Sequence, residues 1–524
     1  MSGASGMGRP ELVFGLVGPV GTRISDLKKS LIETLKGFNY STVDIHVSDL
    51  LRHFKEWVDE SDSTTCTRIE HRQKIGLAFR SRMSDGAALA RAAIAKIREE
   101  RAKISGSTDS PAVDHAFVLD QLKHPAEVAL LREVYGASFL LIAGHAPDDQ
   151  RATQLAQVQA KDEQATSPAS YLGRARSIIA DDMKQDDERG LGQNTRDTYP
   201  LADFFANLGA VSGENQVGRF VDLLFGHPFH TPYPNEYAMY QASSVALRSS
   251  DENRQVGAAI VQFTRDKLDK VRKTDVVALG MNEVPRRGGG FYWHEDSPDG
   301  RDQWLLACKD SDRAELIKIS MLKELLERIQ KKGWMTENGR QRLSRELARD
   351  LLPDLKGTQF LNIGEFMRPV HAEMAAIIDA ARRGVAIDGL TMYVTTFPCH
   401  NCAKHVIAAG IQQVIYLEPY PKSRTSFLHE EEVQLQASEF NPQEERVVFL
   451  AYTGIAPRQY QRLFSMAARG GKNGVSLRSW PEARSTLPPR YVSLFAFHSI
   501  NAAEKAALKK LDVQIYNWDP AKLG

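Results

Sequence analysis

The stretch that decides the fold of the C-terminal half is residues 371–402, HAEMAAIIDAARRGVAIDGLTMYVTTFPCHNC. Apolar residues recur at helical spacing after His371 and again after Pro398, which predicts two helices that begin near these points. Between them, residues 390–396 are rich in β-branched and aromatic side chains and predict a strand. The unit is therefore helix, strand, helix, with chemically active residues in the first turn of each helix.

These two helix starts carry residues that are suited to holding a metal ion. Cys399 and Cys402 are three positions apart and share one helix face. The positive end of the helix dipole favours their thiolate forms. Together with His371 they supply three zinc ligands, which leaves a fourth position for water, as a catalytic zinc requires. Glu373 is then a carboxylate beside that water and is suited to carrying protons.

Simpler interpretations of the same residues exist. A lone C-x-x-C is also typical of a redox pair or of half a structural zinc site. A structural site needs a fourth ligand, and His405 is the candidate nearby. Both halves of the motif are present in this order, each with its helix, which favours the catalytic interpretation.

The composition indicates a nearly neutral, cysteine-poor globular chain. Its 524 residues suggest two to four domains. Lys and Arg number 67 against 66 Asp and Glu, so no global basic field favours nucleic acid. Four cysteines make no disulfide framework and indicate a reduced, cytoplasmic setting. Residues 1–10 lack the apolar core of a secretory signal and are expected to be disordered, and the apolar run 138–143 is too short to span a membrane.

Residues 11–225 predict an α/β domain of the P-loop type. A buried strand runs into a glycine-rich turn and a helix, and further strands alternate with helices, which fits a doubly wound parallel sheet. Backbone N–H groups at such a turn cradle phosphate, so we expect a regulatory nucleotide there. The candidate nucleotide-binding residues are Gly15, Gly18, Gly21, Thr22, Arg23 and Asp120.

The glycine-rich turn departs from the P-loop pattern. The motif requires Gly-Lys-Ser/Thr, but Gly21 is followed by Thr22 and Arg23, and the next lysine is Lys28. Phosphoryl transfer is therefore disfavoured, and the plainer alternative is that the glycines only turn the chain. The acidic residues from Asp181 to Glu188 are expected to form a solvated helix face.

Residues 226–524 form the second predicted domain. A cluster of helix-breaking residues at 227–234 marks the join. The order that follows is helix, two strands, the HAE helix, a strand, the PCxxC helix and a strand, which predicts an α/β/α sandwich. A long helical insertion, about 294–368, interrupts it, and a C-terminal extension, about 425–524, follows it.

The insertion contains two periodic helices, at 311–331 and 337–352. We interpret them as a helical hairpin that packs on the core or at a subunit interface, in preference to a substrate lid. We assign no chemistry to the C-terminal extension.

The order of the motifs resembles that of the deoxycytidylate deaminase family. Residues 249–261, the run Gly280-Met281-Asn282, HAE and PCxxC match its blocks in order. The pattern H-x-E…P-C-x-x-C is the signature of zinc nucleobase deaminases. The added P-loop kinase-like domain, degenerate in its loop, is most similar to that of the bacterial anti-phage deoxycytidine nucleotide deaminases.

The resemblance implies roles for individual residues. Zn²⁺ would be bound by His371, Cys399 and Cys402, and Glu373 would be the catalytic proton shuttle. The substrate-binding residues, of which Asn282 would contact the sugar or base edge and Arg254 would lie near the phosphate, are Asn282, Arg254, Arg286, Trp293, Tyr420 and Lys422. The family's Ser-x-Cys is replaced here by Ser-Asp-Glu at 250–252, which puts any further contact from that stretch in doubt.

The implied activity is zinc-dependent hydrolytic deamination of dCTP, dCMP or both to dUTP or dUMP plus ammonia. The implied role is anti-phage defence by nucleotide depletion, regulated through the N-terminal domain. An inhibitory RNA or protein partner and a homo-oligomer belong to the same expectation, whereas a membrane partner does not. The choice between dCMP and dCTP is left open.

Three other functions compete with this hypothesis. A polynucleotide cytosine or adenine deaminase would require a basic, aromatic-lined groove, which the near-neutral chain disfavours. A nucleotide kinase or NTP-binding regulatory protein would use the zinc only structurally. A non-catalytic scaffold would have no use for Glu373.

Overall fold

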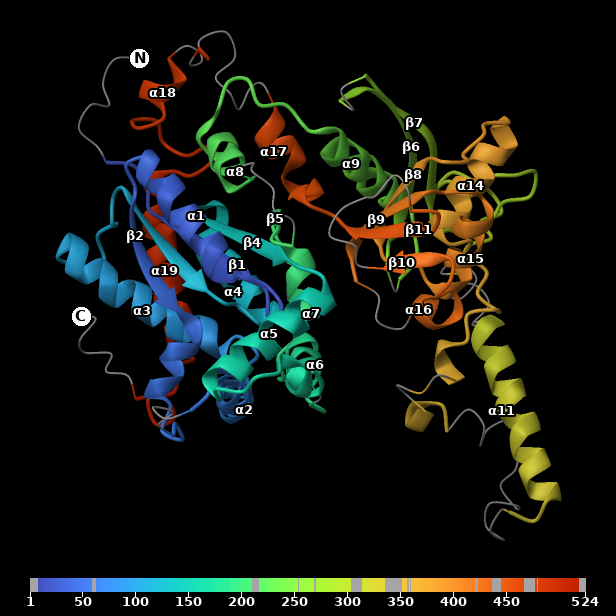
Figure 1. Cartoon of the computed structure of the whole chain (residues 1–524), viewed down its shortest axis with the longest axis horizontal. Coiled ribbons are helices and arrows are strands. Elements are labelled where there is room, and N and C mark those ends of the chain that lie inside the picture. Colours follow the sequence, from blue (N-terminus) through green and yellow to red (C-terminus); the bar gives the residue numbers. More distant parts are fainter. Residues whose placement is uncertain are drawn as a thin grey trace. The chain divides into compact units, whose positions relative to one another are not determined.

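The structure is a computed structural model in which the chain forms two compact units (Figure 1). The first unit comprises Met1–Tyr240, Ile415–Pro419 and Val433–Gly524, and the second comprises Gln241–Val414 and Tyr420–Glu432. No helix within the described part of the chain is both long and apolar enough to cross a membrane. The described residues are 8–58, 63–185, 187–209, 216–252, 254–267, 270–302, 313–334, 351–355, 358, 360–419, 423–435, 444–465, 476–477 and 479–517.

The sheet of the first unit is built on five parallel strands in the order β2-β3-β1-β4-β5, with the short β12 added antiparallel to β5. All residues of β1 are buried, as expected for a strand that is covered on both faces. The predicted parallel α/β sheet is therefore confirmed. The strands are β1 (Leu12–Val17), β2 (Ser41–His46), β3 (His115–Asp120), β4 (Phe139–His145), β5 (Phe204–Asn207) and β12 (Gly454–Ile455).

Helices cover both faces of this sheet. α1 (Ile24–Gly37) and α8 (Gln216–Phe225) share an apolar core with alternate residues of β1. α3 (Ala88–Ser105), α4 (Pro125–Tyr135) and α19 (Phe497–Leu508) lie outside that core and pack against one another. The remaining helices of this part are α2 (Thr65–Met83), α5 (Asp148–Asp162), α6 (Leu172–Met183), α7 (Thr195–Thr198), α17 (Tyr460–Phe464) and α18 (Trp480–Ala483). α9 (Pro234–Ala246) begins in the first unit, and its residues from Gln241 on belong to the second.

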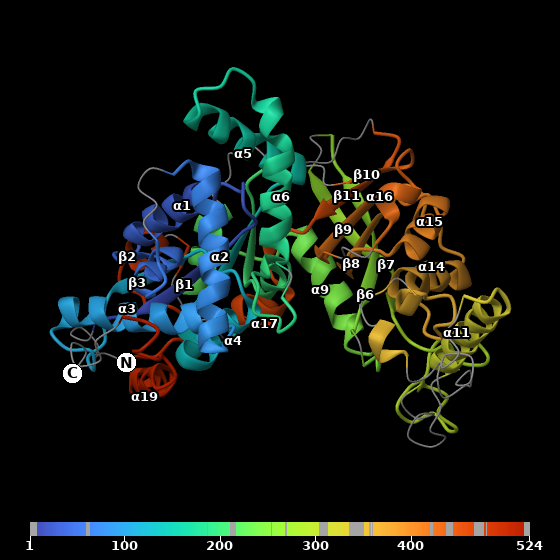
Figure 2. The ribbon, with the colours of Figure 1, turned by 90° about the horizontal axis from the view of Figure 1, so that it is seen from below.

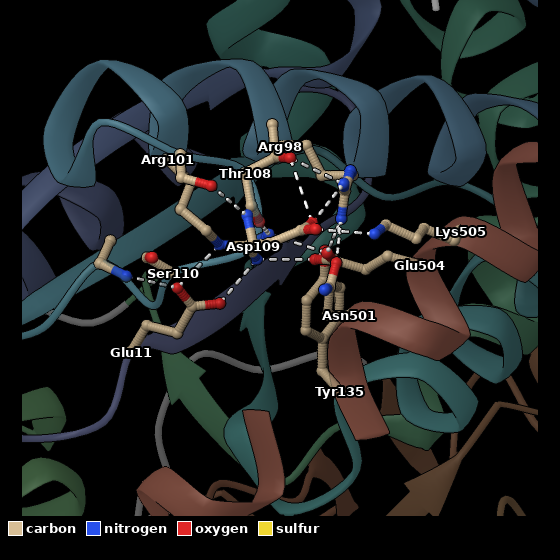
Figure 3. A network of polar contacts seen from close by, with 12 residues as sticks. Glu11, Arg98, Arg101, Thr108, Asp109, Ser110, Tyr135, Asn501, Glu504 and Lys505 are labelled. Carbon is tan, nitrogen blue, oxygen red and sulfur yellow. Dashed lines mark hydrogen bonds and ion pairs between the residues drawn. The ribbon is translucent and has the colours of Figure 1, made fainter. Parts of the chain in front are cut away.

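A buried ionic network joins α19 to the start of the chain (Figure 3). Arg101 on α3 pairs with Glu504 on α19 and with Glu11, each at 2.7 Å. Arg98 lies 3.0 Å from Glu504, and the Tyr135 hydroxyl donates a hydrogen bond to it at 2.9 Å. The side chains of Arg101 and Glu504 have no exposed surface. Each buried charge is thus compensated, which is the condition for such a network to be tolerated.

This network explains where the structure differs from the expected domain organisation. We expected residues 425–524 to extend the second domain. The strands at Val433–Leu435 and Val447–Ala451 do join the second sheet, whereas α19 packs against α3 and α4, and Val433–Gly524 is grouped with the first unit. Arg101 and Glu504 are 403 positions apart in the sequence. No local pattern of apolar residues signals such a pairing, because it depends on complementary charges that only the fold brings together.

The strands of the second sheet follow the order β10-β11-β9-β8-β6-β7. β6 is antiparallel to both β7 and β8, whereas β10 and β11 are parallel. The predicted alternation of two strands, helix, strand, helix and strand is confirmed. The strands are β6 (Gly257–Arg265), β7 (Val271–Met281), β8 (Thr391–Thr396), β9 (Gln413–Glu418), β10 (Val433–Leu435) and β11 (Val447–Ala451).

Two glycines show that helices lie on opposite faces of the β6–β7 hairpin. A Cβ atom at Gly257 would collide with the backbone of Ala242 on α9. A Cβ atom at Gly280 would collide with the backbone of Ala372, at the start of the HAE helix. Gly280 is paired with Ala258, the residue next to Gly257, so the two glycines face opposite sides of the pleat. This arrangement is an α/β/α sandwich, as predicted.

Part of the helical insertion is described. α11 (Arg313–Lys331) corresponds to the first predicted helix, with Ile319 and Leu322 buried against neighbouring residues of the insertion. The second predicted helix, 337–352, lies almost wholly outside the described residues. A short helix, α16 (Thr425–Leu428), follows β9.

We predict that Glu504→Ala lowers the free energy of unfolding of the first unit by about 3–5 kcal/mol, because it leaves Arg101 buried with a partner missing. The measurement is urea unfolding followed by circular dichroism. Lys505→Ala is the matched control, because Lys505 pairs with Asp109 at the surface and should change stability by less than about 1 kcal/mol. Equal effects of the two substitutions would contradict the importance of the buried network.

Candidate active site

His371 and Cys399 each occupy the N-cap position of a helix. His371 precedes α14 (Ala372–Arg383), and Cys399 precedes α15 (His400–Ala408). Both residues have extended backbone angles, and their carbonyl groups accept the first helical N–H groups at 2.8 and 2.9 Å. α14 and α15 lie side by side (Figure 1 and Figure 2). The two helix starts therefore meet at one place.

The three predicted metal ligands converge there. The Nδ1 atom of His371 lies 3.4 Å from the Sγ atoms of both Cys399 and Cys402. Zinc bound tetrahedrally at about 2.0 Å from nitrogen and about 2.3 Å from sulfur would hold such atoms about 3.5 Å apart. The nitrogen and two sulfur atoms thus fit a zinc ion that keeps a further position open.

The charge state of Cys399 suits a metal ligand. The Cys402 hydrogen bond, together with the neighbouring His371, lowers the pKa of the Cys399 thiol to about 4. The thiolate is the form of cysteine that binds metal. Burial raises the pKa of Glu373 to about 7, and the nearby Cys399 thiolate adds to the rise. A carboxyl group that titrates near neutral pH can both accept and release a proton.

Glu373 lines a cavity that is also lined by two of the three metal-ligand residues. The residue is 4% exposed and lines this cavity together with His371 and Cys399. Buried carboxyl groups with a raised pKa are typical of functional sites. The position of Glu373 beside three metal-ligand residues therefore indicates a role in proton transfer. The other lining residues are Asp251, Arg254, Val256, Asn282, Met367, Pro369, Ala372, Thr396 and Phe397.

Comparison with known proteins agrees with this geometry. Residues 232–418 match the cytidine and deoxycytidylate deaminase zinc-binding region. This match covers about a third of the chain. His371, Cys399, Cys402 and Glu373 all lie within it, and we call residues 232–418 the deaminase region. The cofactor that this region takes is zinc.

The aligned relatives share short segments with the chain. The deoxycytidylate deaminase of Enterobacteria phage T2 is 49% identical over 55 residues, which are 10% of this chain and 29% of that protein. ComE operon protein 2 of Bacillus subtilis is 49% identical over 53 residues, 10% and 28% of the two chains. The alignments thus span less than a third of these relatives. The crystal structure of dCMP deaminase from cyanophage S-TIM5 in apo form is 15% identical with a TM-score of 0.22, and the match covers 43% of this chain and all of that one.

The structure brings together some of the expected substrate residues. Arg254 and Asn282 line the cavity of the deaminase region. Arg286 and Trp293 are absent from its described lining: Arg286 pairs with Asp296 at 2.8 Å, and the Arg248 guanidinium stacks on Trp293 at 3.4 Å from the ring centre. Tyr420 and Lys422 lie outside the described residues.

Several lining residues were not expected from the sequence. Thr396 and Phe397 directly precede the PCxxC motif, and Met367 and Pro369 precede HAE. Their closeness in sequence to the metal ligands was the available signal. Asp251 stands in the stretch that departs from the family pattern, so its place in the cavity could not be inferred from that pattern.

The expected nucleotide-binding residues of the first unit are largely engaged within the protein. Gly15 is buried inside β1, and a Cβ atom at Gly21, whose φ is +84°, would lie 2.7 Å from the Arg151 carbonyl oxygen. Asp120 pairs with Lys28 at 2.9 Å and with His46 at 3.3 Å. Burial opposes ionisation of Asp120, but its hydrogen bonds with these two partners lower its pKa.

The remaining expected residues lie in the turn after β1. A Cβ atom at Gly18 would collide with the Ile24 side chain. The Thr22 hydroxyl is buried, and Arg23 is half exposed beside Asp26.

A carboxylate already holds this glycine-rich turn. The Val20 N–H donates a hydrogen bond of 2.8 Å to Asp182 on α6. Lys123 lies 2.9 Å from the same carboxylate and donates to the Gly18 carbonyl at 2.7 Å. Asp182 has no exposed surface, so the expectation that it forms part of a solvated face is wrong. A phosphate that bound to the Val20 N–H would have to displace Asp182.

A second group of metal-ligand residues, Asp222, His227 and His230, is poorly suited to a metal. The Nδ1 atom of His227 accepts hydrogen bonds from the backbone N–H groups of Phe229 and His230, each at 3.2 Å. Its lone pair is therefore used, and the other nitrogen of the neutral ring carries the proton. The His230 ring stacks on it at 3.7 Å. We assign this cluster to stabilising the turn.

We predict that Cys399→Ser and His371→Ala each lose most of the bound zinc, because each removes a ligand of a three-residue site. Zinc content of the purified proteins is measured by plasma mass spectrometry. His405→Ala is the control, because His405 is exposed and absent from the described ligand cluster. Loss of zinc from the control would favour a four-ligand structural site.

We predict that Asp182→Ala destabilises the first unit by about 3–5 kcal/mol, because Lys123 would be left buried without its partner. Asp181→Ala changes an exposed neighbour on the same helix and should be nearly neutral. Guanidinium unfolding of both variants measures the difference. A stable Asp182→Ala protein would show that the turn does not depend on this carboxylate.

Proposed function

We propose that the deaminase region catalyses zinc-dependent hydrolytic deamination of deoxycytidine nucleotides, dCMP or dCTP, to the matching deoxyuridine nucleotide and ammonia. The observation that carries this proposal is the buried Glu373 carboxyl group beside His371, Cys399 and Cys402, in a cavity that also contains Arg254. His371, Cys399 and Cys402 would hold the zinc ion, which would supply an activated water molecule when bound.

Glu373 supplies the proton transfers of the reaction. It takes one proton from the attacking water and delivers it to the ring nitrogen N3. It then takes the second proton, from the hydroxyl now bonded to C4, and delivers it to the amine, which leaves as ammonia. A pKa of about 7 suits both directions of transfer at neutral pH. Because the carboxyl group is buried, bulk water does not reach it. Glu373 therefore exchanges protons with the attacking water molecule and with the pyrimidine base of the substrate.

The cavity lining supports a nucleotide substrate. Met367, Pro369 and Phe397 supply apolar surface for a pyrimidine ring. Arg254 is exposed at the same cavity and presents a guanidinium group to an anionic phosphate. A single arginine suits a monophosphate and a triphosphate alike, so both belong to the proposal.

The competing functions have less support. A polynucleotide deaminase would gain from a basic surface, but the formal net charge is +1. A nucleotide kinase would need a phosphate-binding lysine in the turn after β1, where Thr22 and Arg23 stand instead. The Val20 N–H in that turn is already hydrogen-bonded to Asp182.

We further propose that the protein depletes deoxycytidine nucleotides during phage infection and acts in the cytoplasm as a homo-oligomer. Control through the first unit, by a regulatory nucleotide or by an inhibitory RNA or protein partner, belongs to the same proposal. Its support is the resemblance in motif order and the presence of a parallel α/β sheet in the same chain. A regulatory nucleotide that used the turn after β1 would act by releasing Asp182.

We predict that Glu373→Ala keeps its zinc but deaminates dCMP and dCTP about a hundred to ten thousand times more slowly than the wild type, because the proton shuttle is gone. Ammonia release and zinc content are measured on both proteins. Glu365→Ala, an exposed carboxylate before the same helix, should keep wild-type activity.

Two outcomes would contradict the proposed function. A zinc-loaded Glu373→Ala protein with wild-type activity would remove Glu373 from the mechanism. Ammonia released from cytidine-containing oligonucleotides but from neither free nucleotide would favour a polynucleotide deaminase.

A further inference from the structure

Glu283 is a buried carboxylate near the proposed substrate cavity, but it is not among the described lining residues. It follows the end of β7 and is 2% exposed. Its Oε2 atom accepts hydrogen bonds from the Ser250 N–H at 3.0 Å and from the Ser250 hydroxyl at 2.8 Å. Its Oε1 atom accepts the Val284 N–H at 2.8 Å. Both oxygens are therefore fixed by donors.

The backbone of Glu283 is tied to the segment that bears a zinc ligand. Glu283 and Val370 exchange hydrogen bonds in both directions, at 3.2 Å and 2.9 Å, and form an isolated antiparallel bridge. Val370 directly precedes His371. Glu283 thus contacts the segment that precedes His371 through its backbone, and it contacts Ser250 through its side chain.

Asn282 makes a parallel set of contacts to the same stretch. Its Oδ1 atom accepts the Val256 N–H at 2.7 Å, and its Nδ2 group donates to the Arg254 carbonyl at 2.8 Å. Residues 249–252 and 254–256, which we call the substrate loop, are therefore held at both ends. Glu283 holds the first end and Asn282 holds the second.

We propose that Glu283 is a positioning residue that fixes the substrate loop to the zinc-ligand segment, so that Arg254 meets the substrate phosphate while the base reaches Glu373. This inference rests on the proposed function. Arg254 and Asp251 line the cavity, and Ser250 is the neighbour of Asp251 in the chain. Glu283 acts through the loop and makes no contact with the substrate itself.

The hydrogen-bond geometry explains why a carboxylate is needed. Glu283 faces two backbone N–H groups, from Ser250 and Val284, and neither can rotate away. Glutamine has the same shape, but its NH₂ group only donates. In Glu283→Gln one of the two N–H groups would therefore meet another donor, and the loop would lose a fixed contact. The substitution changes hydrogen bonding with little change in volume.

The test uses Glu373→Ala as the parent, because it should bind substrate and convert it about a hundred to ten thousand times more slowly than the wild type. The dissociation constants of dCMP and of deoxycytidine are measured by calorimetry, with zinc content and thermal unfolding measured on the same samples. Deoxycytidine lacks the phosphate, so it does not report on Arg254. Glu252→Gln, an exposed carboxylate in the same loop, is the matched control.

We expect Glu283→Gln to weaken dCMP binding about tenfold and to leave deoxycytidine binding and zinc content unchanged. Arg254→Ala should weaken dCMP binding similarly, and adding Glu283→Gln to it should cause no further loss. In the active protein, Glu283→Gln should raise KM for dCMP with little change in kcat. Ser250→Ala removes the hydroxyl donor to Glu283 but keeps the backbone N–H donor, so it should act in the same direction with a smaller effect.

Several results would overturn the inference. One is that Glu283→Gln binds dCMP as tightly as the parent, and another is that it weakens the binding of dCMP and of deoxycytidine equally. The inference also fails if Glu283→Gln weakens dCMP binding further when it is added to Arg254→Ala, or if the Glu283→Gln protein loses its zinc. If Glu283→Gln does not fold, the same outcomes are judged on Ser250→Ala. A parent that binds no deoxycytidine nucleotide would contradict the proposed function and the inference together, whereas tight dCMP binding by both parent and variant would contradict the inference alone.

Discussion

The meeting of two helix N-termini places His371, Cys399 and Cys402 around one point, and the chemistry of the deaminase region depends on it. An N-cap side chain lies at the end of the helix axis, where backbone N–H groups and the helix dipole favour negative charge. The convergence also brings Cys402 and His371 to Cys399, and their hydrogen bonds lower the pKa of the Cys399 thiol. The same convergence buries Glu373 beside the ligands and raises its pKa. The position of the metal-ligand residues, the thiolate charge of Cys399 and the burial of Glu373 thus all follow from the meeting of the two helix starts.

Much of this site could be predicted from the sequence because its determinants are local. Helical spacing after His371 and Pro398 predicted both helices. The spacing of Cys399 and Cys402 predicted a cluster with His371 that could hold a metal ion, and the structure brings these three residues together. The sandwich followed from the order of strands and helices between the motifs. Contacts that depend on the folded arrangement could not be read in this way. Glu283 is an example. Its side chain accepts hydrogen bonds from Ser250 and its backbone bonds to Val370, and both residues are far from it in the sequence.

The sequence predicted the parallel sheet of the first unit, but it did not predict the buried ion pairs of that unit. The alternation of strands and helices indicated the parallel order correctly. The pairing of Arg101 with Glu504 joins residues from distant parts of the chain, so the place of the C-terminal helix could not be inferred. Asp182 was expected at the surface because acidic residues cluster around it, yet it is buried against Val20 and Lys123. Composition predicts average exposure, whereas a buried ion pair is set by particular partners.

The central claim is that the residues around His371 direct a solvent water molecule onto a deoxycytidine nucleotide. The most direct measurement is mass spectrometry of the product after zinc-loaded protein has acted on dCMP in water enriched in heavy oxygen. The account predicts that each dUMP formed carries one solvent oxygen on its pyrimidine ring and that ammonia is released in equal amount. Failure to form dUMP from dCMP and also dUTP from dCTP under the same conditions, or a product without the heavy oxygen, would contradict it.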